Sequence, residues 1–115
     1  MILETNSYIA EPDVTVFSIV GRLSLGSASQ SLEWKLQELV TGGVRKLVVD
    51  VTNLVAIDSA GVGILVLVAG QMAEAGGAMR IAGASGGVAR TFEVVHLHRI
   101  VPLCGDLPAG LASFG

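Results

Sequence analysis

The chain has 115 residues, a formal net charge of −3 and a hydrophobic fraction of 51%. This length predicts a single domain over residues 1–115, and seven lysines and arginines without a basic cluster argue against nucleic-acid binding. The longest apolar run, residues 60–70, is too short to span a bilayer, and the N-terminus lacks the pattern of a signal peptide. We therefore expect a soluble cytoplasmic protein without direct membrane insertion.

The chain is predicted to open with two strands. Residues 2–9 and 14–20 are rich in residues that favour strands, and Pro12 supplies a turn between them. The short connection predicts a β-hairpin. Gly21 is expected to end the second strand.

A helix is predicted next. Ser27 and Gln30 match a capping box, in which two side chains satisfy the free N–H groups of a helix start. The apolar residues that follow share one helical face: Ala28, Leu32, Leu36, Leu39 and Val40. Gly42 and Gly43 predict the end of this helix.

The rest of the chain alternates strands with helices. The predicted elements are a buried strand at 46–51, a helix at 59–75, a strand at 78–83, a shorter helix marked by Val88, Phe92 and Val95, and an edge strand at 99–103. Residues 106–108 can open one more helical turn. Such alternation requires parallel crossovers, so the predicted fold class is α/β, with one mixed, mostly parallel sheet, an N-terminal hairpin and helices packed against it.

The most informative residue is Ser59, which stands where a buried strand and a turn lead into a helix. A hydroxyl at a helix start is often only a cap. A phosphate placed there also meets free N–H groups and the positive end of the helix dipole. The preceding Asp58 has two interpretations: it caps the helix, or it positions the Ser59 hydroxyl for an incoming phosphoryl group.

A helical projection of residues 59–75 separates two faces. Val62, Leu65, Val66, Ala69, Met72 and Ala73 are predicted to pack on the sheet. The outer face is predicted to hold Ser59, Gly63, Ile64, Leu67 and Gly70, with Gln71 and Glu74 toward solvent. The apolar outer residues are either ordinary exposed side chains or a docking patch for a partner beside Ser59.

Enzyme motifs fail in this sequence. Ser59 loosely matches a nucleophile elbow, but Ile57 stands where that motif needs glycine, and nothing suggests that His96 or His98 faces the serine. The glycine-rich stretches match neither a Walker loop nor a dinucleotide fingerprint. Cys104 is the only cysteine, so no multi-cysteine zinc site is possible. We expect no enzyme activity, no cofactor and no metal.

The order of elements, together with NLVAIDSAGVGIL at residues 53–65, resembles a STAS domain of the bacterial anti-sigma-factor-antagonist type. The resemblance covers nearly the whole chain. It includes Gly21-Arg22-Leu23, the segment LVVDVTNL before the turn, and Gly76-Gly77.

The resemblance implies partner switching. In that family an unphosphorylated antagonist binds an anti-sigma factor, often a serine kinase with an ATP-binding fold, and so frees the sigma factor. The kinase phosphorylates the motif serine, which matches Ser59, and a phosphatase resets the system. Asp58 matches the acidic residue before that serine, and Gly61 matches the glycine after it.

The resemblance also predicts a partner surface. Family members often carry an acidic residue after the Gly-x-Leu of the second strand, where this chain has Ser24. The expected surface comprises Ser24, Ser27, Asp58, Ser59, Ala60, Gly61, Gly63, Ile64 and Leu67. The alternative function is a STAS subunit of a signalling scaffold or membrane transport complex that is not switched at Ser59.

Overall fold

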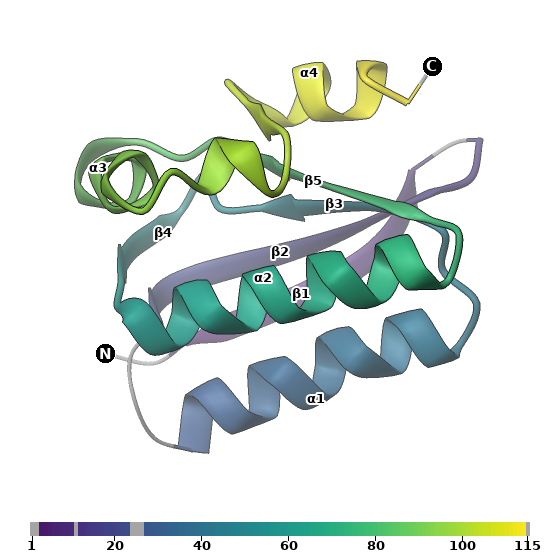
Figure 1. The fold of residues 1–115 in the computed structure, drawn as a ribbon, viewed down its shortest axis with the longest axis horizontal. Helices are drawn as coiled ribbons and strands as arrows, with labels where there is room; N and C mark the ends of the chain where they lie inside the picture. The colour runs from purple at the N-terminus through teal and green to yellow at the C-terminus, as the bar shows by residue number, and fades with distance from the viewer. Residues whose placement is uncertain (1–2, 11, 24–26, 115) are drawn as a thin grey trace.

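The computed structural model describes residues 3–10, 12–23 and 27–114, apart from the side chains of residues 27–29. The strands form one sheet in the order β1-β2-β3-β5-β6, and β4 pairs with β2 beyond the end of β3. Figure 1 shows α1 and α2 side by side along one face of this sheet, with α4 on the other face. The predicted α/β class is confirmed, because parallel strands follow an antiparallel hairpin.

The hairpin comprises β1 (Glu4–Ala10) and β2 (Val14–Leu23). The prediction that Gly21 ends β2 is wrong. The strand continues through Gly21, which has a φ of 107°, and the register to its new partner shifts at this point. That partner is β4 (Leu54–Ile57), which the sequence prediction had assigned to a turn.

The two long helices are α1 (Ser27–Thr41) and α2 (Ser59–Glu74). Each ends in a Schellman motif, which satisfies carbonyls that a helix C-terminus leaves free. After α1, Val44 N–H donates to the Leu39 carbonyl at 3.0 Å, and Gly43 takes a φ of 101°. Gly76 has the same position after α2, with a φ of 84°. The predicted glycine end of α1 is confirmed, and α2 ends within one residue of the predicted range 59–75.

The central strands follow these helix ends. They are β3 (Lys46–Asp50) and β5 (Ala78–Ala82), and they pair in parallel. The middle residues of β3 are fully buried because helices cover both faces of this part of the sheet. Thr52 begins the turn after β3 and donates its hydroxyl and N–H to Asp50 Oδ1, at 2.6 and 3.0 Å.

The last third of the chain departs from prediction at one strand. The helix α3 (Gly86–Val94) packs against β4, and His96 ends it in the left-handed conformation. The expected strand at 99–103 is instead a 3-10 turn, η1 (Leu97–Arg99), followed by the two-residue strand β6 (Leu103–Cys104). Leu97 and Val101 are buried, but Arg99 between them is exposed. In a strand all three would share one face, so this pattern suits a helical turn better than a strand.

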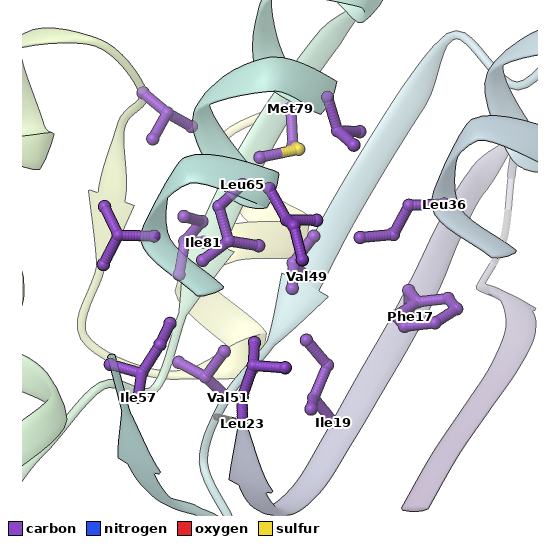
Figure 2. Close-up of a cluster of buried hydrophobic side chains, with 14 of the residues drawn as sticks. Phe17, Ile19, Leu23, Leu36, Val49, Val51, Ile57, Leu65, Met79 and Ile81 are labelled. Atoms are coloured by element: carbon purple, nitrogen blue, oxygen red, sulfur yellow. The ribbon is translucent and has the colours of Figure 1, made fainter. Parts of the chain in front are cut away.

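Two apolar clusters form the core, one on each face of the sheet. The larger lies under α1 and α2, where Figure 2 shows Leu36 and Leu65 above side chains of β2, β3 and β5. The smaller comprises Val14, Val16, Val48 and Ala82, covered by the short helix α4 (Leu107–Ala112). Gly110 lets α4 approach closely, since an added Cβ would lie 3.2 Å from Val48 Cγ1.

Gly77 gives a test of this packing. A Cβ on Gly77 would lie 2.6 Å from the backbone carbonyl oxygen of Arg45, so Gly77→Ala should lower the free energy of unfolding by about 1–3 kcal/mol through overpacking. Gly70 lies inside α2 with nothing within 4 Å of such a Cβ. The control Gly70→Ala should therefore stabilise the fold by about 0.5–1 kcal/mol. Urea denaturation measures both, and equal effects would contradict the packing described.

Candidate functional site

The start of α2 is held by Asp58. Its backbone is extended, and its Oδ1 accepts a hydrogen bond from Gly61 N–H at 3.0 Å, while its carbonyl accepts from Val62 N–H at 3.0 Å. The capping interpretation is therefore confirmed. Within the described residues, the N–H groups of Ser59 and Ala60 make no hydrogen bond. The exposed Ser59 thus stands at a helix start with free donors and a positive dipole.

The same turn is fixed to the sheet. Asp58 N–H donates to the carbonyl of Leu23, the last residue of β2, at 3.2 Å. Gly61 is buried against the ends of β2 and β4, since an added Cβ would lie 2.7 Å from Ile57 Cγ1 and 2.8 Å from Leu23 Cδ2. Gly61 therefore seats the helix on the sheet, and its contact with a partner stays a prediction.

The outer face of α2 is as predicted at four positions. Ser59, Gly63 and Gly70 are exposed, and Leu67 is 43% exposed. Nothing lies within 4 Å of a Cβ placed on Gly63, so this glycine leaves open space above the helix. Ala60 is half-buried at the end of this face. A partner can reach the backbone of α2 closely beside Ser59.

Ile64 does not belong to this face. It is only 7% exposed and is part of the main core cluster. The projection assumed that α2 packs on the sheet alone, but α2 also packs against α1, so its buried stripe is wider. Val68, on the same flank, is fully buried, and Gln71 is half-buried, not solvated. On the opposite flank, Ala73 is exposed although it was expected to face the sheet.

The remaining predicted contacts fall elsewhere. Ser24 lies outside the described residues, and so does the side chain of Ser27. One apolar residue near the turn was missed: Val55, on β4, is 56% exposed. The signal that could have revealed it is the apolar segment at residues 54–57, which has strand character once it is separated from the turn before it.

Other chemistry finds little support around Ser59. The rings of His96 and His98 contact each other edge to face, with centroids 5.9 Å apart, and within the described residues neither bonds to the serine. The described part of the chain holds no group of three His, Cys, Asp or Glu residues suited to a metal. None of its helices is long and apolar enough to cross a membrane.

Most of the chain is matched by a family model. The model of the STAS domain matches residues 7–109. The chain belongs to the STAS domain family. No protein of curated function matches its sequence significantly.

Solved structures share this STAS fold. An anti-sigma factor antagonist from Mycobacterium paratuberculosis superposes with a TM-score of 0.87 at 20% identity, covering 97% of this chain and 93% of that one. A variant of Moorella thermoacetica RsbS gives 0.78 at 21%, covering 95% and 92%. The Bacillus cell fate determinant SpoIIAA, in its phosphorylated form, gives 0.75 at 15%, covering 97% and 100%. At these identities the likeness establishes the fold.

The cap of α2 can be tested by substitution. Asp58→Ala removes the acceptor for Gly61 N–H and should lower the free energy of unfolding by about 0.5–2 kcal/mol. Asp58→Asn keeps a side-chain oxygen in place and should recover most of this loss. Thermal and urea unfolding measure the difference. Equal stability of the alanine and asparagine variants would show that the cap contributes nothing.

Proposed function

We propose that this STAS domain is an anti-sigma-factor antagonist, a non-enzymatic regulator that is switched off by phosphorylation of Ser59. The observation that carries the proposal is an exposed serine at the first position of α2, on a face with Gly63 and Leu67. The adjacent N–H groups of Ser59 and Ala60 make no hydrogen bond within the part of the chain that the structure describes. A structure of SpoIIAA in a phosphorylated form shares the fold and supports the idea of a phosphorylated state.

In the unphosphorylated state, the outer face of α2 binds the anti-sigma factor. Leu67 supplies an apolar anchor that is 43% exposed in the free protein. Gly63 and Gly70 have no side chains to hold the partner away from the helix. An apolar anchor in a setting of small residues favours close packing and exclusion of water. Binding occupies the anti-sigma factor, which then releases its sigma factor.

Phosphorylation breaks this complex without breaking the fold. The anti-sigma factor, acting as a kinase, transfers the γ-phosphoryl group of ATP to Ser59 Oγ, while the hydroxyl proton passes to the kinase and ADP leaves. The new group adds about −1.5 to −2 charges. Asp58 already stands beside it, so negative charge accumulates at the edge of the docking face. A phosphatase transfers the phosphoryl group to water and restores the binding state.

The free energies involved indicate that phosphorylation of Ser59 should affect partner binding much more than folding. The helix dipole stabilises a negative group at this position by about 0.3–1 kcal/mol, or about 2 kcal/mol when it is partly buried. An unpaired charge in a desolvated interface costs about 2–5 kcal/mol. This penalty corresponds to roughly 30- to several-thousand-fold in affinity. The cost falls on the complex, so the partner dissociates while the domain stays folded.

The site of modification is tested with the anti-sigma kinase of the same organism and radiolabelled ATP. Wild type should incorporate one phosphoryl group per chain, and Ser59→Ala should incorporate none, since it lacks the accepting hydroxyl. Ser85, the exposed N-cap residue of α3, provides the matched control. Ser85→Ala should be phosphorylated like wild type. Undiminished labelling of Ser59→Ala would remove Ser59 from the mechanism.

The effect on binding is tested with a charged replacement. Ser59→Glu should weaken binding of the anti-sigma factor about 30-fold or more, as measured by isothermal titration calorimetry. Its thermal unfolding midpoint should not lie below that of wild type, because a negative charge at a helix start stabilises the helix.

Leu67→Lys should weaken the same complex by placing a charge on the docking face. Val94, which is 69% exposed on α3, serves as the control, and Val94→Lys should bind like wild type. If a complex persists unchanged in both Ser59→Glu and Leu67→Lys, the domain is a constitutive subunit of a larger assembly and not a switch.

A further inference from the structure

The two edges of the sheet are built differently. One edge is β6, which has two residues and follows Pro102. Short strands and proline are among the devices by which proteins keep sheet edges from pairing. The other edge is β1, which pairs with β2 over seven residues without a bulge. Within β1 there is no proline, and Glu4, at its end, is the only charged residue. The second edge therefore lacks the protection that the first one has.

The open edge also carries exposed apolar side chains on both faces. Ile9 is 74% exposed, the highest value among the large apolar side chains of the described residues, and Tyr8 is 44% exposed. Ser7 pairs with Phe17 of the larger core cluster, so Ser7 and Ile9 lie on the face of α1. Tyr8 lies on the opposite face. A strand placed against β1 would cover parts of both side chains.

A hollow lies next to this edge on the α1 side. It has a volume of about 390 Å³ and is bordered by Thr5, Ser7, Phe17, Lys35 and Leu39, among others. Lys35 Nζ donates a hydrogen bond to Thr5 Oγ1 at 3.0 Å across it. Its floor is apolar at Phe17 and Leu39, and its rim is polar, so it suits one apolar side chain entering from beyond the edge.

We propose that β1 pairs in antiparallel fashion with β1 of a second copy of this chain, around a twofold axis at Ser7. In this register Ile9 of one copy stands opposite Thr5 of the other, next to the hollow. The remaining pairs join Asn6 to Tyr8 and Glu4 to Ala10. No like charges face each other in this register, which avoids the repulsion that destabilises directly opposed pairs.

The second copy fits this edge because the pairing is self-complementary. A twofold contact brings the same patch of both subunits together, so a protruding side chain and its receiving surface must lie on one strand. Ile9 and Thr5 lie on one face of β1, two residues on either side of Ser7. The contact also leaves the switch turn open, because β2 separates β1 from β4, which leads into Ser59.

Light scattering on the intact protein tests the assembly. Wild type should show about twice the chain mass of 11.8 kDa. Ile9→Lys should have the mass of one chain with an unchanged unfolding midpoint. The substitution removes the apolar side chain that would enter the hollow and places a charge against Phe17 and Leu39 of the other copy. The control is Ile100, which is 55% exposed and lies outside β1. Ile100→Lys should remain dimeric. A monomeric wild type, or a dimer that survives Ile9→Lys, would overturn the proposal.

Cross-linking tests the register in a Cys104→Ser background. Directly opposed residues of antiparallel strands have Cα atoms about 4.5–5.5 Å apart, within the reach of a disulfide. Ser7→Cys should therefore give a covalent dimer under mild oxidation. The control Glu4→Cys, whose copies would be about 20 Å apart, should not. Equal cross-linking of the two variants would contradict the twofold axis at Ser7. Ser59→Glu should stay dimeric, which separates this proposal from the switch.

Discussion

The contact between the first turn of α2 and the ends of β2 and β4 is the constraint on which the exposed face of α2 depends. Gly61 lies directly on Leu23 and Ile57 with no room for a side chain, and the backbone of Asp58 is bonded to β2. The helix therefore begins at a fixed place and angle. Because Gly61 turns inward, Ser59 and Gly63, two residues to either side, turn outward. A glycine needed for packing thus decides which residues of α2 face solvent.

Much of this architecture could be predicted from the residues. Gly43 ends α1 as expected, because positive φ favours glycine and few other residues. The capping role of Asp58 and the exposure of Ser59 followed from local chemistry. Predictions failed where distant contacts decide the structure. A single-helix projection does not include α1, so Ile64 was placed on the wrong side. Strand β4 was missed because it pairs with the end of β2, more than thirty residues earlier in the chain. Gly21 was expected to end β2 before that pairing begins.

The side chains that stabilise the fold differ from the groups that the proposed switch uses. Stability comes from the cluster under α1 and α2, whose members are almost fully buried and lie away from the outer face of α2. The proposed switch uses one exposed hydroxyl and the N–H groups next to it, which have no hydrogen-bond partner among the described residues. Since the two sets have no residue in common, charge at Ser59 can change an interface strongly while the core remains as it was.

Because α4 is short, the face of the sheet that it covers should unfold locally more easily than the face covered by α1 and α2. Six residues are too few to form a stable helix alone, so α4 depends on Gly110 against Val48 and on the end of the chain. There the guanidinium of Arg80 lies 4.5 Å from the ring centre of Phe114, and its Nε donates to Ser113 Oγ at 3.1 Å. Amide hydrogens of α4 should exchange with solvent well before those of α2. During local unfolding, the smaller apolar cluster should be exposed to water before the larger one.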